Sequence, residues 1–86
     1  MTLDGQTPEI AYPCHWEYRL VGRDADVMQT RAAAIMGDRE HTLKRGHQSK
    51  KGTFISLHLK ALVFSHDDRR ALFDALRADS AFLHVL

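Results

Sequence analysis

Six histidines in a chain of 86 residues are the side chains here that could most readily hold a metal ion. A zinc site needs three or four converging ligands, and these commonly come in closely spaced pairs. No His-x₃-His pair and no Cys-x-x-Cys motif occurs in this sequence. The sequence therefore predicts separate surface or edge histidines and no metal site. These histidines are His15, His41, His47, His58, His66 and His84.

Nucleophilic catalysis would need a cysteine or serine held against a base, with a third group that orients the base. Cys14 is followed directly by His15, but adjacent residues of a strand point to opposite faces, so these side chains cannot easily pair. Asp67 and Asp68 lie at an expected helix start, where carboxylates stabilise the helix dipole. We therefore expect no catalytic residue and no cofactor, and we expect that the protein is not an enzyme.

Basic residues and one phenylalanine gather around the middle of the chain and are the best candidate for a binding surface. RNA-binding proteins of the RRM type stack bases on aromatic side chains of an open sheet face. Phe54 fits this chemistry, although the several aromatics of the RRM strand motif are missing. The alternative is a solvated hairpin in which Phe54 packs on Arg19 or on a second copy. The candidate surface comprises Lys44, Arg45, Lys50, Lys51, Phe54, His58 and Lys60.

Charge and composition narrow the class of protein. Twelve lysines and arginines nearly balance eleven aspartates and glutamates, for a net charge of +1, which gives no support to general polyanion binding. The N-terminus lacks the features of a secretory signal, and no apolar run approaches the roughly 18–20 residues that span a bilayer. A single cysteine is typical of a reducing compartment. We therefore expect a soluble, cytoplasmic protein with no membrane contact.

The strands that must position these residues are marked by alternation. Apolar side chains occupy every second position of residues 55–63, which predicts a β-strand with one buried face. Residues 15–21 alternate in the same way and predict a first strand with its aromatic side chains inward. Residues 40–47 predict a short polar edge strand, joined to the long strand by a turn at residues 49–52. Residues 81–86 predict a final strand.

Two helices are marked by their start signals. Asp24 or Asp26 can cap a first helix, which Gly37 ends. Ser65 begins a sequence that resembles a capping box and predicts a second helix over residues 66–78. The apolar side chains expected to face the core are Val27, Met28, Ala32, Ile35 and Met36 in the first helix and Leu72, Phe73 and Leu76 in the second.

The order β-α-β-β-α-β predicts an α+β fold of the ferredoxin-like type. Its compact form is a four-stranded antiparallel sheet with both helices on one face. Residues 1–11 are polar or small and predict a flexible tail, so that residues 12–86 make up a single domain.

Three stretches carry a resemblance to a known family: residues 12–22 (YPCHWEYRLVG), 49–56 (SKKGTFIS) and 85–86 (VL). They resemble the YbeD-like family of small uncharacterised bacterial proteins, whose fold is similar to the ACT regulatory domain. The resemblance implies an ACT-like, ferredoxin-like domain with a regulatory role, and a link by gene neighbourhood to lipoate metabolism. Residues 37–48 match this family poorly, and Phe54 stands where the family tends to have tyrosine.

The expected function is therefore binding or regulation by protein contact or by a small-molecule effector, with a homodimer as one form of self-association. Ligand-binding ACT domains typically carry an Asp-x-Pro-Gly-like turn after the first strand, whereas residues 22–26 here read GRDAD. Gly22 could still let a ligand approach the backbone closely. The alternative function is single-stranded nucleic-acid binding through the basic hairpin and the open sheet face.

Overall fold

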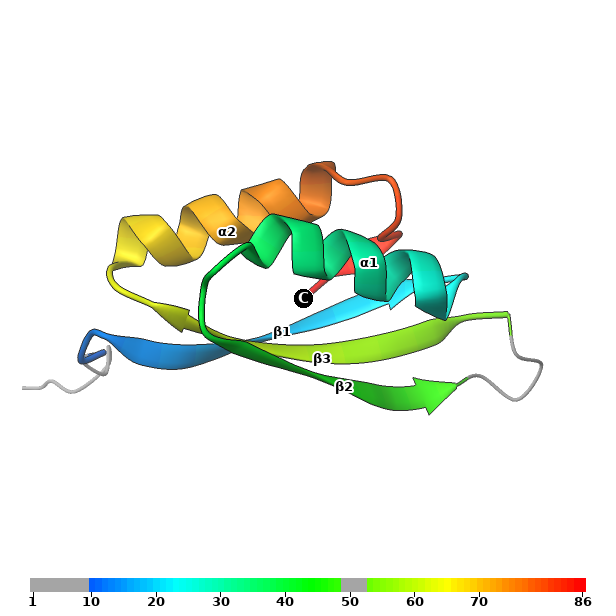
Figure 1. Ribbon diagram of the computed structural model, residues 1–86, viewed down its shortest axis with the longest axis horizontal. Helices are drawn as coiled ribbons and strands as arrows, with labels where there is room; N and C mark the ends of the chain where they lie inside the picture. The colour runs from blue at the N-terminus through cyan, green and yellow to red at the C-terminus, as the bar shows by residue number, and fades with distance from the viewer. Residues whose placement is uncertain (1–9, 49–52) are drawn as a thin grey trace, which may run out of the picture.

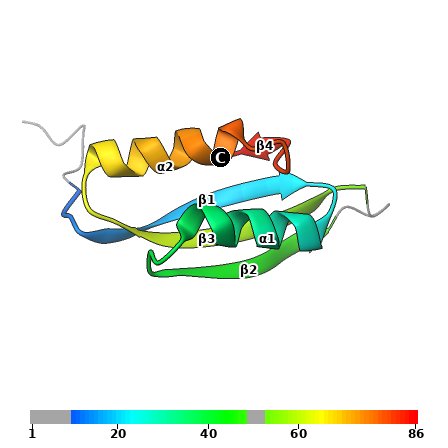
Figure 2. The same ribbon diagram turned by 45° about the horizontal axis from the view of Figure 1, so that its top comes forward.

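The computed structural model describes residues 10–48 and 53–86. In this part of the chain the elements are β1 (Cys14–Gly22), α1 (Ala25–Met36), β2 (His41–Gln48), β3 (Ile55–Val63), α2 (His66–Ala78) and β4 (His84–Val85). The strands form one antiparallel sheet in the order β2-β3-β1-β4. Both helices lie on the same face of that sheet (Figures 1 and 2). The predicted ferredoxin-like α+β fold is confirmed.

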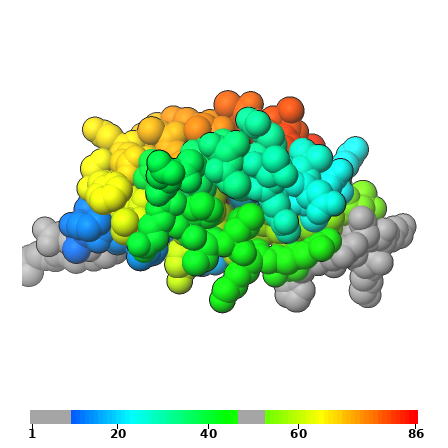
Figure 3. All heavy atoms as spheres, in the orientation of Figure 1, coloured from blue at the N-terminus to red at the C-terminus, as the bar shows by residue number. Residues whose placement is uncertain are grey.

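The core lies between the sheet and the helices, and β3 supplies its centre. Every second residue of β3, from Ile55 to Val63, is buried, as the alternation predicts. On β1, Tyr18 and Leu20 are buried beside them, whereas Trp16 is only half-buried. The predicted inward faces of both strands are therefore confirmed. The space-filling view shows side chains of α1 and of the β2 region closing over the front of the molecule (Figure 3).

Helix α1 begins at the N-cap Asp24, whose carboxylate accepts hydrogen bonds from the backbone N–H groups of Asp26 and Val27. Met28, Ala32 and Met36 are its buried residues. Their spacing of four gives a narrow buried stripe. Val27 lies beside this stripe and is 46% exposed, so its predicted burial is wrong. Gly37 ends the helix with φ of 57°, a backbone conformation that favours glycine.

Helix α2 begins at Ser65, whose hydroxyl accepts a hydrogen bond from the Asp68 N–H, as the predicted capping box requires. The Asp68 carboxylate also forms a two-pronged pair with the guanidinium of Arg39, at 2.8 and 3.0 Å. This pair and a hydrogen bond from the Phe64 N–H lower the pKa of Asp68. The buried residues Leu72 and Leu76 of α2 belong to the same core cluster as the buried residues of β1 and β3.

The final strand is much shorter than predicted: β4 contains only His84–Val85. The reason is a turn around Asp79, whose backbone carbonyl accepts from the Phe82 N–H while its carboxylate accepts from the Ala81 N–H. This turn buries Phe82 in the core before the chain reaches the sheet. The long strand β1 is therefore paired along its whole length with β3 but over only two residues with β4.

Candidate functional site

The predicted basic surface is divided by the sheet. Lys44, His58 and Lys60 lie on the face opposite the helices, where Lys44 and His58 are directly paired across the strands. Arg45 follows Lys44 on the same strand and pairs with Leu57, which places it on the helix side. The expectation that Lys44 and Arg45 act on one surface is therefore wrong. Lys50 and Lys51 lie outside the described residues.

The open face is also mixed in charge. The Glu17 carboxylate lies 3.2 Å from Nδ1 of His58. Close by, the Glu40 carboxylate lies 2.7 Å from Nε2 of His15. Carboxylates thus sit beside the basic side chains of this face, which weakens its attraction for a polyanion.

Phe54 is 41% exposed and directly precedes β3, at the end of the sheet where Arg23 follows β1. The guanidinium of Arg23 lies 5.8 Å from the centre of its ring. One ring contact of Phe54 is thus with Arg23, whereas the sequence suggested Arg19 or a second copy. Arg23 follows β1 directly, so this contact ties Phe54 to the β1–α1 turn.

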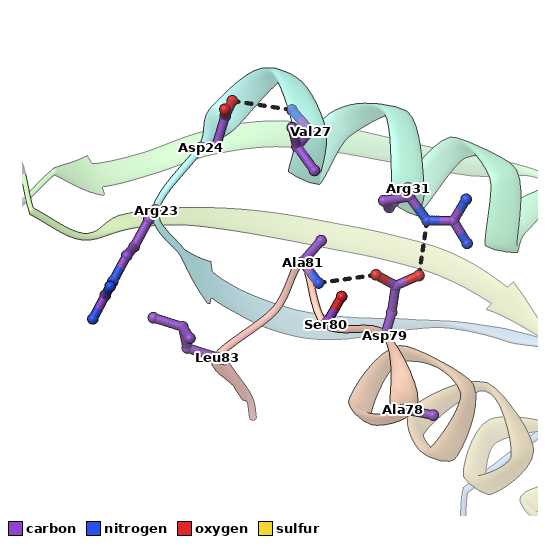
Figure 4. Close-up of a pocket in the computed structure, with 9 residues that line it drawn as sticks. All are labelled: Arg23, Asp24, Val27, Arg31, Ala78, Asp79, Ser80, Ala81 and Leu83. Carbon is purple, nitrogen blue, oxygen red and sulfur yellow. Dashed lines mark hydrogen bonds and ion pairs between the residues drawn. The ribbon is translucent and has the colours of Figure 1, made fainter.

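A depression of about 610 Å³ opens at this same end of the molecule, between the β1–α1 turn and the α2–β4 loop (Figure 4). We name it the turn pocket. Its walls come from two segments that are far apart in the sequence but side by side in the fold. The turn pocket is lined by Arg23, Asp24, Val27, Arg31, Ala78, Asp79, Ser80, Ala81 and Leu83.

Both carboxylates of the turn pocket already serve the fold. Asp24 caps α1. Asp79 accepts from the Ala81 N–H at 3.0 Å and from Nε of Arg31 at 2.8 Å. The hydrogen bond from Ala81, and next the one from Arg31, lower the pKa of Asp79. The Asp79 carboxylate is thus ionised at neutral pH and already hydrogen-bonded, and it balances the charge of Arg31.

Arg23 differs from Arg31, because it forms no ion pair with any described residue. In Figure 4 its side chain extends away from the Arg31–Asp79 pair, on the side of Leu83. Val27 and Leu83 are 46% and 45% exposed and supply apolar walls. A cation beside exposed apolar groups suits a small molecule that combines an anionic group with an apolar body.

Gly22 does not have the role that the sequence suggested. A Cβ atom at this position would lie 2.6 Å from the Ala81 carbonyl oxygen and 2.7 Å from Sδ of Met28. The close approach at Gly22 is made by the α2–β4 loop of this chain, so no space remains there for a ligand backbone. Sequence reasoning did single out the β1–α1 turn, but nothing in the sequence pointed to residues 79–83 as its neighbour.

A second depression, of about 350 Å³, lies between α2 and the outer side of β1. We name it the β1 groove. The Arg69 guanidinium stacks 4.0 Å from the centre of the Trp16 ring, and the Tyr18 hydroxyl donates to the Arg69 carbonyl at 2.7 Å. Burial raises the pKa of Tyr18 to about 12. The β1 groove is lined by Trp16, Tyr18, His66, Arg69, Arg70, Phe73, Asp74, Arg77 and Leu86.

Two absences hold for the part of the chain that the structure describes. There, no group of three or more histidine, cysteine, aspartate or glutamate side chains is placed to hold a metal ion. Neither α1 nor α2 is long and apolar enough to cross a membrane.

A family model described as "Protein of unknown function (DUF493)" matches residues 7–86. The chain is similar to the uncharacterised protein Cj0253 of Campylobacter jejuni, with 32% identity over 76 residues, 88% of this chain and 87% of the relative. It is also 26% identical to an uncharacterised protein of Helicobacter pylori over 76 residues, 88% of each chain. The resemblance to the YbeD-like family agrees with these matches at the level of small uncharacterised bacterial proteins.

Solved structures support the same fold. The solution structure of protein HP0495 from H. pylori matches with a TM-score of 0.81 at 24% identity, over 100% of this chain and 94% of that chain. A second solution structure of HP0495 from Helicobacter pylori matches with a TM-score of 0.64 at 24% identity, over 96% of each chain. At this identity the likeness carries the fold alone.

Proposed function

We propose, from the premise that this chain belongs to the DUF493 family of proteins of unknown function, that it is a non-enzymatic binding module for a small carboxylic acid with an apolar body. The observation that carries this proposal is Arg23, a cation with no ion pair among the described residues, at the rim of a pocket with apolar walls from Val27 and Leu83. A carboxylate would supply the missing counter-charge, and an aliphatic chain would cover the exposed walls.

The charge balance of the turn pocket favours an anion over a cation. Asp24 is engaged as a helix cap, and Asp79 is engaged with Arg31 and Ala81. Bringing a ligand ammonium group to these carboxylates would compete with bonds that hold the fold together. Arg23 has no such competing carboxylate, so it can meet a ligand anion with little loss elsewhere.

The same pocket supports binding rather than catalysis. Its only hydroxyl belongs to Ser80, and none of the side chains that line it is a histidine or cysteine. A nucleophile without a base beside it is weak at neutral pH. A ligand held in this pocket is therefore retained unchanged, as expected of an effector.

A regulatory role follows from where the turn pocket lies. Its walls are the β1–α1 turn and the loop that carries β4. A ligand that contacts both the turn and the loop would stabilise their present arrangement over other arrangements. A protein partner that binds this end of the molecule would then bind the ligand-bound and ligand-free forms differently. The ACT-like resemblance supports this role, and the implied link to lipoate metabolism adds lipoate to the acids worth testing.

The experiment is a titration of ¹⁵N-labelled protein with octanoate, lipoate and leucine, followed by amide chemical shifts. We expect shifts concentrated at residues 23–27 and 79–83. Octanamide, which lacks the charge, should bind at least about tenfold more weakly, since a charge-assisted hydrogen bond contributes about 1.5–3 kcal/mol. Arg23→Gln should weaken acid binding to the same degree.

Arg19→Gln is the matched control, because Arg19 is an exposed arginine of β1 outside the turn pocket. It should leave the affinity unchanged. Failure of all three acids to shift residues 23–27 at millimolar concentration would count against the proposal. So would equal binding by the Arg23→Gln variant.

Single-stranded nucleic-acid binding stays a prediction that no observation here favours. Arg45 lies on the other side of the sheet from Lys44, and Glu17 lies beside His58. Retention on an RNA column that weakens steeply with salt would revive it.

A further inference from the structure

The outer edge of β1 is open over half its length. Backbone N–H and C=O groups of Arg19 both bond to Leu86, at 2.9 Å each. Because these groups point to the same side at every second residue of an antiparallel strand, those of Glu17 and His15 point to this outer side too. Within the described residues β4 pairs with β1 only at Leu20 and Val21, so no described strand lies beside residues 14–18. An unpaired edge of this kind can accept an added strand.

The β1 groove runs along this open edge and is rich in positive charge. Arg69, Arg70 and Arg77 line it against a single acidic side chain, that of Asp74. None of these arginines forms an ion pair within the described part of the chain. Arg69 and Arg77 instead lie over aromatic rings, 4.0 Å from the centre of Trp16 and 5.5 Å from that of Phe73. Nη2 of Arg69 lies 2.8 Å from Nδ1 of His66, whereas stacking leaves the N–H groups at the edge of the Arg77 guanidinium able to bind carboxylates.

The charge of the groove argues against a second copy as its occupant. Two copies paired edge to edge through β1 would meet about a two-fold axis and present the same surface to each other. The arginines of one α2 would then face those of the other. Like charges across an interface oppose association, whereas an acidic segment complements them.

We propose that the open edge of β1 and the β1 groove together bind an extended acidic segment of a partner protein, which adds a strand beside residues 14–18. The backbone of this segment pairs with His15 and Glu17, and its carboxylates meet Arg70 and Arg77. Five residues of open edge match the usual length of a short strand. This inference does not depend on the turn pocket, which lies at the β1–α1 turn rather than beside α2.

The test uses the full chain, ¹⁵N-labelled, and an eight-residue peptide of alternating glutamate and valine with blocked ends. We expect the amides of His15 and Glu17 to shift at peptide concentrations up to about 1 mM. The same peptide with lysine in place of glutamate should bind at least tenfold more weakly. A version methylated on alternate backbone nitrogens should also lose at least tenfold, because it cannot complete the strand ladder.

Charge reversal on the protein completes the test. Arg70→Glu combined with Arg77→Glu should weaken binding of the glutamate peptide by more than tenfold, and circular dichroism should show an unchanged helix content. Arg45→Glu, an exposed arginine on the strand at the far edge of the sheet, is the control and should leave binding nearly unchanged.

Four results would each overturn the proposal. These are unchanged His15 and Glu17 amides, equal binding of the lysine peptide, a dimer that already covers the β1 edge, and oligouridine occupying the groove in place of the peptide. Shifts at residues 23–27 are not expected from the peptide, so failure here is distinguishable from failure of the turn pocket.

Discussion

The two halves of β1 differ in what covers their outer side. At its C-terminal end Leu20 is fully buried, Gly22 lies under the α2–β4 loop, and Arg19 is bonded to Leu86. At its N-terminal end Cys14 and Trp16 are half-buried, Tyr18 alone is buried, and no described strand lies on the outer side. We name these the covered half, residues 19–22, and the open half, residues 14–18.

One cause separates the two halves, the shortness of β4. The turn at Asp79 uses residues 79–83 to cross the end of the sheet, so β4 begins only at His84 and pairs with β1 at Leu20 and Val21. The covered half therefore contributes mainly to stability. The open half keeps unpaired backbone groups and a charged groove, which are the features a partner can use.

Leu20→Ala should cost about 3 kcal/mol of unfolding free energy, since a fully buried leucine replaced by alanine leaves a cavity. Cys14→Ala is the counterpart in the open half and should cost about 1 kcal/mol or less, because Cys14 is half-buried. Urea denaturation measures both. Similar losses from the two variants would mean that the halves are equally packed.

Gly22→Ala should cost about 2 kcal/mol, because the new methyl group meets the backbone oxygen of Ala81, which cannot move without shifting the loop. The matched control is Gly46→Ala on the edge strand β2. The atoms nearest to a Cβ there belong to the side chains of His58 and Ser56, at 2.7 Å. These can rotate aside, so about 1 kcal/mol or less should be lost. An equal cost at both glycines, measured by urea denaturation, would show that the loop yields as easily as a side chain.

The fold could be predicted from local signals because each element has its own. Apolar side chains at every second residue predicted β3. The N-cap Ser65 predicted the start of α2, and Gly37 predicted the end of α1. Val27 and the long final strand were predicted wrongly, since the depth of a helix face and the turn at Asp79 depend on tertiary contacts.

The candidate sites were harder to predict, because their residues come from separate segments. The turn pocket brings Arg23 together with Leu83, and the β1 groove brings Trp16 together with Arg69. No spacing in the sequence records such proximity. The separation of Lys44 from Arg45, in contrast, follows from strand alternation and was available from the sequence.

Asp79→Asn should change how stability depends on acid. The pKa of Asp79 is lower in the folded state than its unfolded value of about 3.9. The ionised carboxylate therefore stabilises the fold above about pH 3.9. This stabilisation is lost as the pH falls through the folded-state pKa. The variant should be about 1 kcal/mol less stable at neutral pH and should lose less stability as the pH falls from about 5 to below the lowered folded-state pKa. Asp74→Asn, at an exposed position of α2, is the control. Identical acid dependence in both variants would remove Asp79 from this role.

The smallest free energy of local opening is expected at the backbone amides on the outer side of the open half. The amides of His15 and Glu17 should exchange with deuterium at close to unprotected rates, because their outer side has no described partner strand. The amides of Tyr18 and Leu20 point toward β3 and should exchange only on global unfolding. Arg19 should fall between them, since its partner Leu86 is 68% exposed at the chain end. Slow exchange at His15 and Glu17 would mean that the outer edge of β1 is already covered. That result would contradict both the open half and the proposed docking of an acidic strand.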